Sequence, residues 1–191
     1  NIGKTTYEYD IIGGIEGLEE GYTAERTIDP KGNRTVKIFD KTGRLKEVDT
    51  EEGNVIYDYY ANGNRRSITY PDGSNETYTY YGDNRNKTLV NRKDDGTEID
   101  SFYYEYDGAG NMTKKEDVKG ETAYSYDSLN RLETVAEPNG KTTSYHYDKA
   151  GNRKAEIINE NGGMVSTSYE YDSQNRLMST ISYAGSTTYT T

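Results

Sequence analysis

One short pattern recurs along this chain: an aromatic residue, then Asp or Tyr, two free residues, Gly or Asn, and finally Asn or Arg. The aromatic residue stands at Phe39, Tyr59, Tyr80, Tyr106, Tyr126, Tyr147 and Tyr171. Successive copies are separated by 20, 21, 26, 20, 21 and 24 residues. Repetition at this period indicates a chain built from one small structural unit, in which each copy packs on the next.

The other positions of the pattern carry turn residues. Asp follows the aromatic residue in five copies, at Asp40, Asp107, Asp127, Asp148 and Asp172, whereas Tyr60 and Tyr81 take its place in two. The next position of the pattern is Gly43, Gly63, Asn84, Gly110, Asn130, Gly151 and Asn175. Gly and Asn tolerate positive φ, which tight turns require. A second turn signal follows 10 to 12 residues later, at Gly53, Gly73, Gly96, Gly120, Gly140, Gly162 and Gly185.

Turns at this spacing leave strands of about five to seven residues. Tyr-x-Tyr pairs precede most of the first turns, as in Tyr124-Ser125-Tyr126, and the two rings share one face of a strand. Each repeat is therefore predicted to form two antiparallel strands, about 14 in all. Because so wide a sheet rarely stays flat, we expect an all-β fold: an antiparallel hairpin ribbon that curls into a spiral or open shell.

The domain organisation predicted from the pattern is a single repeat array over residues 1–191. Residues 37–183 form regular repeats, and residues 11–36 are a divergent repeat or a loop. Within that stretch, Ile28 to Asn33 resembles the pattern with Ile in the aromatic position. The sequence begins inside a repeat and without Met, which is typical of a piece of a longer chain.

Composition excludes several classes of protein. Hydrophobic residues make up 31% of the chain and the net charge is −10, values that would normally indicate disorder. However, 21 tyrosines favour a folded β-structure, because Tyr buries a large ring while its hydroxyl stays solvated. The pI near 4.7 argues against nucleic-acid binding. No apolar run is long enough for a membrane span, and without Cys there are neither disulfides nor thiolate metal sites.

No arrangement of residues predicts catalysis, so we expect neither an enzyme nor a cofactor. The repeated Asp is interpreted as a turn residue whose carboxylate bonds the backbone N–H two residues on. Calcium binding by these turns is the alternative, although their spacing matches neither an EF-hand nor a calcium-binding nonapeptide. The one histidine, His146, occupies the polar position between two tyrosines and is predicted to lie on the surface.

The pattern Tyr-x-Tyr-Asp-x-x-Gly-Asn/Arg, at a step of about 20 residues, resembles the YD repeat of Rhs proteins, bacterial wall-associated proteins, toxin-complex shell subunits and teneurins. The resemblance runs from Phe39 to Arg176, with Tyr7 to Asp10 in addition. It implies a secreted or cell-surface bacterial protein whose repeats form a hollow β-shell around a toxic or signalling segment. No Asp-Pro-type cleavage motif follows Arg176, so we expect a shell segment without its cargo and processing protease.

The resulting hypothesis is a structural segment that encloses or presents a toxin or adhesive tip. Its expected partners are neighbouring repeats and the enclosed cargo, with no nucleic acid. The alternative is a lectin-like module in which exposed tyrosine rows bind cell-surface glycans or proteins. Edge-to-edge self-association is also expected, because an open ribbon has two unpaired edges.

Overall fold

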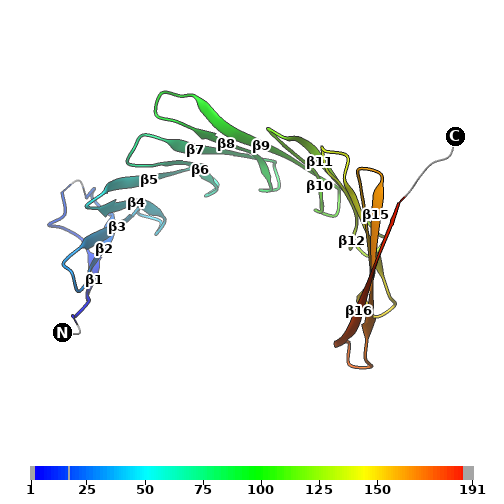
Figure 1. The fold of residues 1–191 in the computed structure, drawn as a ribbon. Coiled ribbons are helices and arrows are strands. Elements are labelled where there is room, and N and C mark those ends of the chain that lie inside the picture. Colours follow the sequence, from blue (N-terminus) through cyan, green and yellow to red (C-terminus); the bar gives the residue numbers. More distant parts are fainter. Residues whose placement is uncertain (1–2, 17, 187–191) are drawn as a thin grey trace. The chain divides into compact units, whose positions relative to one another are not determined.

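The computed structural model describes residues 3–16 and 18–186. This part of the chain consists of strands and their connections (Figure 1). The strands are β1 (Thr6–Ile11), β2 (Thr23–Ile28), β3 (Arg34–Phe39), β4 (Leu45–Thr50), β5 (Gly53–Tyr59), β6 (Arg65–Thr69), β7 (Asn75–Tyr80), β8 (Asn86–Arg92), β9 (Glu98–Tyr106), β10 (Met112–Asp117), β11 (Gly120–Tyr126), β12 (Leu132–Ala136), β13 (Thr142–Tyr147), β14 (Arg153–Glu160), β15 (Gly163–Tyr171) and β16 (Leu177–Ser186).

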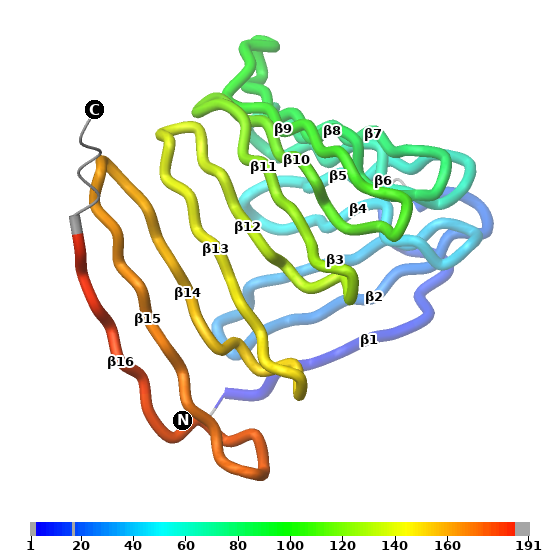
Figure 2. The backbone as a smooth tube through the Cα atoms, turned by 90° about the vertical axis from the view of Figure 1, so that its right-hand side faces the viewer, coloured from blue at the N-terminus to red at the C-terminus, as the bar shows by residue number. Residues whose placement is uncertain are grey.

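The strands pair in chain order from β1 to β16. The predicted all-β architecture of antiparallel hairpins is confirmed. The chain divides into two compact units, unit 1 over residues 1–101 and unit 2 over residues 102–191. Within each unit the strands lie side by side in sequence order (Figure 2). The seven repeats supply the fourteen strands β3 to β16, and the N-terminal segment adds β1 and β2.

The first turn of each repeat has one backbone geometry. In the copy that begins at Tyr106, the Asp107 N–H donates to the Asn111 carbonyl at 2.9 Å, and the Gly110 N–H donates to the Asp107 carbonyl at 3.1 Å. Gly110 has φ of 96°, and Asn130 holds the same position with φ of 59°. Such a three-residue hairpin loop needs a residue in the left-handed region, which explains why the sequence alternates only between Gly and Asn there.

The second turn signal at Gly185 does not mark a turn. Gly185 lies within β16, opposite Met164 of β15. The pairing of β15 with β16 continues from Tyr171 opposite Leu177 to Gly163 opposite Ser186, so β16 needs no reversal before residue 186. The prediction of a turn there was wrong because Gly also fits an extended strand, and spacing alone does not distinguish the two.

The N-terminal stretch contains a long connection and a tight turn. Residues 12–16 and 18–22 lie outside the strands in the connection between β1 and β2, whereas residues 29–33 form a tight turn between β2 and β3. That turn repeats the Asp geometry, because the carboxylate of Asp29 accepts from the N–H groups of Lys31 at 2.8 Å and Asn33 at 2.9 Å. Ile28 therefore does occupy the position of the aromatic residue, at the end of β2.

Successive repeats pair in a constant register. The residue eight positions after one motif aromatic lies opposite the residue three positions before the next. The pairs are Glu47–Ile56, Ser67–Thr77, Lys114–Ala123, Thr134–Ser144 and Ala155–Ser168. Because a slip of one residue would turn every side chain to the other face, this register keeps the tyrosines of neighbouring repeats on the same side.

Aliphatic burial is concentrated at one end of unit 1. Ala24, Val36 and Ile38 form a small core, against which Ile11, Ile15, Leu18 and Tyr22 pack. The connection between β1 and β2 thus covers part of this sheet. Ile68 is the fourth buried hydrophobic residue of the described chain, and it also lies in unit 1. In the described part of unit 2, no hydrophobic side chain is fully buried.

Candidate functional surface: the tyrosines and turns that join repeats

Each motif aromatic is the last residue of its strand, just before the first turn: Phe39 in β3, Tyr59 in β5, Tyr80 in β7, Tyr106 in β9, Tyr126 in β11, Tyr147 in β13 and Tyr171 in β15. All seven are half-buried. They are held against the neighbouring hairpin rather than inside a core, since each unit is a single layer of strands (Figure 1).

Tyrosine hydroxyls connect one repeat to the preceding one. The Tyr126 hydroxyl donates to the Met112 carbonyl at 2.8 Å, and the Tyr147 hydroxyl donates to the Leu132 carbonyl at 2.8 Å. The same bond joins Tyr59 to Leu45 at 2.6 Å and Tyr171 to Arg153 at 3.0 Å. In all four cases the acceptor stands six residues after the preceding motif aromatic. A hydroxyl that satisfies a carbonyl of the neighbouring hairpin makes each junction specific for Tyr over Phe.

Arginines near the turns cover the tyrosine rings of the following repeat. The Arg131 guanidinium lies 4.5 Å from the Tyr147 ring centroid, and Arg44 lies 5.0 Å from that of Tyr59. Arg153 is 4.6 Å from the Tyr169 ring. Cation–π contacts of this kind contribute about 0.5–1 kcal/mol at exposed sites. In these three contacts the arginine follows the turn of one repeat and the ring belongs to the Tyr-x-Tyr strand of the next. Arg153 also lies 5.7 Å from the Tyr145 ring of its own repeat.

The motif aspartates accept hydrogen bonds from their own turns. For Asp107 the donors are the Ala109 N–H, the Asn111 N–H and the Asn111 side-chain amide, each at 2.9 Å. The same three kinds of donor recur at Asp40, Asp127, Asp148 and Asp172, with the Arg Nε replacing the amide where Arg ends the motif. The bond to the N–H two residues on is the one expected of Asp at a turn.

These bonds lower the pKa of the carboxylates. The Asn111 side-chain amide is the largest cause for Asp107, and the Arg131 N–H is the largest for Asp127. Burial by itself raises the pKa of Asp40, but hydrogen bonds from its own turn outweigh it and lower the pKa overall. The pKa values of Asp148 and Asp172 are lowered as well. At neutral pH each carboxylate is therefore ionised, and both of its oxygens accept hydrogen bonds within the turn.

The remaining candidate residues lie apart from these junctions. His146 is exposed on β13, as predicted. Gly162 lies in the turn before β15. Over the described residues, no group of three or more His, Cys, Asp or Glu side chains is placed to hold a metal ion. The same part of the chain contains no helix long and apolar enough to cross a membrane.

Comparison with known proteins assigns these repeats to a family. The RHS Repeat family model matches residues 106–138 and 126–164. The chain belongs to the Rhs family of YD-repeat proteins. The tRNA nuclease WapA of Bacillus subtilis (strain 168) is 35% identical over 71% of this chain and 6% of its own length. The double-stranded DNA deaminase toxin A of Burkholderia cenocepacia (strain H111) is 28% identical over 78% of this chain and 11% of its own length.

Solved structures share the fold. A crystal structure of TcdB2-TccC3-Cdc42 superposes with a TM-score of 0.70 at 19% identity and covers 82% of this chain and 10% of its own. The Photorhabdus luminescens Tc holotoxin pore gives a TM-score of 0.68 at 20% identity, over 80% of this chain and 9% of its own. The chain therefore spans about a tenth or less of the relatives and structures that it matches.

Two adjacent Rhs repeats in unit 1 depart from the motif. Tyr60 and Tyr81 replace Asp, yet the backbone turn is kept, since the Tyr60 N–H still donates to the Asn64 carbonyl at 2.8 Å. Tyr60, Tyr80 and Tyr81 line an open groove of about 480 Å³. The Tyr60 and Tyr80 rings meet edge to face at 6.1 Å. Loss of the carboxylate thus converts two turn positions into an aromatic surface.

A side-chain contact that joins the Rhs repeats in successive pairs was not predicted from the sequence. Motifs ending in Gly-Asn alternate with motifs ending in Asn-Arg from Gly63 onward. The Asn111 amide donates to the Asn130 side-chain oxygen at 3.0 Å, and the Asn152 amide donates to that of Asn175 at 2.9 Å. Asn64 and Asn84 make the same bond at 2.8 Å. The alternation of endings was the sequence signal that could have revealed it.

Proposed function

We propose that this chain is a structural segment of a larger Rhs-type protein, in which the repeats form part of a β-shell that encloses or presents a toxin or adhesive segment. The observation that carries the proposal is the use of the recurring side chains. Tyrosine hydroxyls, turn carboxylates and turn amides all bond within a repeat or to its neighbour. The motif therefore builds a continuous wall, and it leaves no recurring group for chemistry on a substrate.

The relatives support this proposal. Two of them bear toxin or nuclease names, and the matched structures are assemblies that contain TccC3. Since the chain spans only a small share of each, the deaminase and nuclease activities in those names are not carried over to it. The proposed location is secreted or on the cell surface, and the proposed partners are neighbouring repeats and an enclosed segment of the same polypeptide.

The wall function is tested by limited proteolysis of the gene product that carries this chain. We expect the segment enclosed by the shell to resist protease at concentrations that degrade the same segment expressed alone. Tyr126→Ala, which opens a junction between repeats, should make the segment susceptible, whereas Tyr183→Ala at an exposed position should not. Equal susceptibility of the enclosed and isolated segments would refute the proposal.

The absence of enzymatic activity is a separate proposal with its own assay. The purified 191-residue chain is incubated with double-stranded DNA and with tRNA, the substrates in the names of two relatives. We expect neither deamination nor cleavage. Turnover that copurifies with the chain and disappears on substitution of one of its residues would refute this proposal.

Sugar binding is a second candidate, favoured by the groove of Tyr60, Tyr80 and Tyr81. Aromatic faces beside an amide suit the apolar face and hydroxyls of a sugar ring, and Asn62 contributes an amide to the lining. Few tyrosines elsewhere in the described chain are exposed: Tyr7, Tyr9 and Tyr183. A glycan array is the test: saturable binding that Tyr81→Ala abolishes and Tyr183→Ala leaves unchanged would support it, and no binding would exclude it.

A further inference from the structure

The groove of Tyr60, Tyr80 and Tyr81 adjoins two turns that lack the carboxylate of the other repeats. In the five copies with Asp, one carboxylate oxygen accepts at 2.8 or 2.9 Å from the backbone N–H two residues on, which belongs to Thr42, Ala109, Leu129, Ala150 or Gln174. The corresponding N–H groups in the two other copies are those of Asn62 and Asp83. Within the described part of the chain neither has an acceptor.

The rest of the turn at Tyr60 is satisfied, so the vacant acceptor position is local. The Asn64 N–H donates to the Asn62 side-chain oxygen at 3.1 Å. The Tyr60 hydroxyl reaches away from the turn and donates to the Tyr78 carbonyl at 2.9 Å. Asn62 also lines the groove. An anion in the groove that bonds the Asn62 N–H would therefore replace the missing motif carboxylate without breaking a bond of the chain.

The segment around the groove is basic, although the chain as a whole is acidic. Residues 60–93 contain six Lys or Arg and three Asp or Glu, a net charge of +3, compared with −10 for the whole chain. Lys87 is exposed, lies 5.5 Å from the Tyr81 ring centroid and forms no ion pair within the described residues. A cation without a carboxylate partner beside the groove favours a negatively charged ligand.

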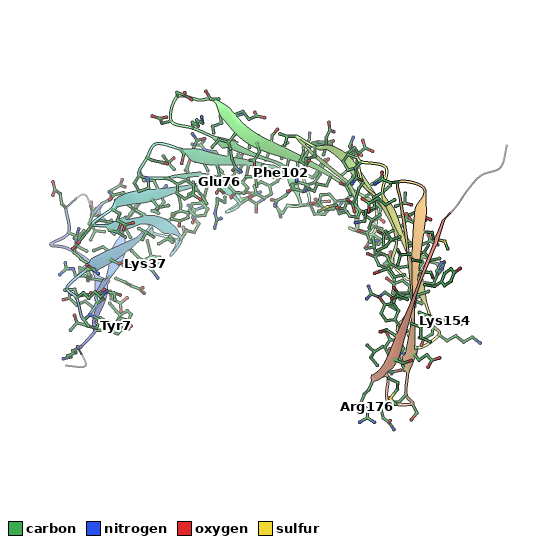
Figure 3. All side chains as sticks on the ribbon, viewed as in Figure 1. Tyr7, Lys37, Glu76, Phe102, Lys154 and Arg176 are labelled. Atoms are coloured by element: carbon green, nitrogen blue, oxygen red, sulfur yellow. The ribbon has the colours of Figure 1, made fainter. Side chains whose placement is uncertain are left out.

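Neighbouring carboxylates already have partners. Glu76, labelled in Figure 3, accepts hydrogen bonds from the Tyr70 and Tyr78 hydroxyls near the start of β7, whereas the groove lies at the end of that strand. Asp83 is paired with Arg85. The positive charge of Lys87 is therefore the one left to attract a ligand.

The shape of the groove favours a ring over a peptide strand. Its volume of about 480 Å³ is within the range of small-molecule sites, about 300–1,000 Å³. The Tyr60 and Tyr80 rings are perpendicular and form an aromatic corner. An extended peptide would need an unpaired strand edge, but β5, β6 and β7 are each paired on both sides.

We propose that this groove binds an acidic sugar, a pyranose ring that carries a carboxylate. The carboxylate accepts from the Asn62 N–H in place of the missing motif Asp, and Lys87 supplies the opposite charge. The apolar face of the sugar ring packs on the tyrosines. This inference rests on the sugar-binding candidate of the proposed function and specifies the chemistry of its ligand.

The first test compares matched glycans on the 191-residue chain. The array contains glycans that end in glucuronic acid and the same glycans ending in glucose, together with sialylated glycans and their desialylated forms. Titration calorimetry of the bound pairs should give about tenfold or more tighter binding of the acidic form, because hydrogen bonds to charged groups are the stronger ones. Equal affinity within each pair would overturn this inference and leave sugar binding in place. Binding of no glycan would overturn both, without bearing on the wall function that proteolysis tests.

The second test removes the charge beside the groove. Lys87→Gln should weaken binding of the acidic glycan about fivefold or more and leave binding of its neutral form unchanged. Lys149→Gln, at an exposed turn residue of unit 2, is the matched control and should change neither. An unchanged preference for the acidic form in Lys87→Gln would overturn the proposal. Displacement of the glycan by a glutamate-rich peptide at the same carboxylate concentration would also overturn it, because the groove would then recognise charge alone.

The third test restores the motif carboxylate. Tyr60→Asp supplies an acceptor for the Asn62 N–H from the chain itself, as in the five regular copies, and should abolish the preference for the acidic glycan. Tyr60→Ala removes the same ring without adding a carboxylate, so it should weaken both forms and keep the preference. Circular dichroism verifies the fold of each variant. A preference for the acidic form that persists in Tyr60→Asp would overturn the proposal.

Discussion

Units 1 and 2 share their hairpins and turns but differ in what packs against the strands. In unit 1, Ala24, Val36 and Ile38 are buried beneath the connection between β1 and β2. In the described part of unit 2, the side chains at the junctions are half-buried tyrosines, arginines and turn amides, and Thr143 alone is classed as buried. One unit has a small conventional core, whereas the other is held by contacts between adjacent repeats.

This difference shows that the aliphatic core is dispensable to the architecture. The same register and the same turn geometry are found in both units. What the core of unit 1 adds is local: it packs against the connection between β1 and β2. The junctions of tyrosine, arginine and asparagine are therefore the common element, and stability in unit 2 is expected to depend on many small contributions.

The largest effect should follow from a charge placed in the core of unit 1. Val36 is fully buried, and Val36→Asp should cost about 4 kcal/mol because a carboxylate loses its hydration there. Ser144→Asp is the matched variant in unit 2, three residues before Tyr147 as Val36 is before Phe39. It should cost far less, since Ser144 is only half-buried. Urea denaturation of both variants gives the comparison, and equal losses would mean that the two units do not differ.

Removal of a junction tyrosine should have the next largest effect, in unit 2. Tyr126→Ala removes a half-buried ring and should cost about 2 kcal/mol, below the value of a fully buried aromatic. Tyr126→Phe removes only the bond to the Met112 carbonyl and should cost about 1 kcal/mol. Chemical denaturation followed by circular dichroism measures both. If Tyr126→Ala were as harmless as Tyr183→Ala, at a position 68% exposed, the junctions would not stabilise unit 2.

Substitution of a turn glycine should have a smaller effect on the free energy of unfolding. Gly140 has φ of 84°, and nothing lies within 4 Å of a Cβ built there, so the cost of a side chain comes from the backbone alone. Gly140→Val should destabilise the chain by about 1–2 kcal/mol. Gly140→Asn should be nearly neutral, because Asn holds the corresponding conformation at Asn130 and Asn175. Thermal denaturation distinguishes the two variants, and identical melting temperatures would contradict the assigned turn type.

The smallest expected effect is a loss of folding stability at alkaline pH, caused by the ionisation of two tyrosines in unit 1. A hydrogen bond to Glu76 is the main cause that raises the pKa of Tyr70 to about 12, and burial followed by the bond to Glu76 raises that of Tyr78 to about 12. Unfolded tyrosine ionises near pH 10. The contribution of these two residues to the free energy of unfolding is therefore present below pH 10 and lost as pH rises towards 12. Glu76→Gln should lower both pKa values, as measured by ultraviolet titration of tyrosinate; unchanged titration would refute the assignment.

The spacing of aromatic, Gly and Asn residues was sufficient to predict the fold class, the hairpins and most turns, because a tight turn restricts φ at a single position. It failed at Gly185, where the same residue type fits an extended strand. It also gave no indication of the Ala24, Val36 and Ile38 core, since the segment that covers those residues has no periodic pattern.

The junction chemistry was only partly predictable. The bonds from Asp107 to its own turn follow from local sequence, because donor and acceptor are two to four residues apart. The bond from Tyr126 to the Met112 carbonyl joins residues 14 apart, and the bond from Asn152 to Asn175 joins residues 23 apart. Such contacts depend on the register between hairpins, which the sequence specifies only through the combined fit of both strands.

The fixed alignment of each motif with its successor makes the length of the array adjustable. A duplicated stretch from one motif aromatic to the next would join the sheet in the same register. Its tyrosine hydroxyl would find the usual carbonyl acceptor on the preceding repeat, and its own carbonyl would accept the tyrosine hydroxyl of the following repeat. Genes of this kind can therefore grow or shorten by whole multiples of the motif without redesign of any neighbour, whereas insertion of a single residue into a strand would leave every later ring on the opposite face.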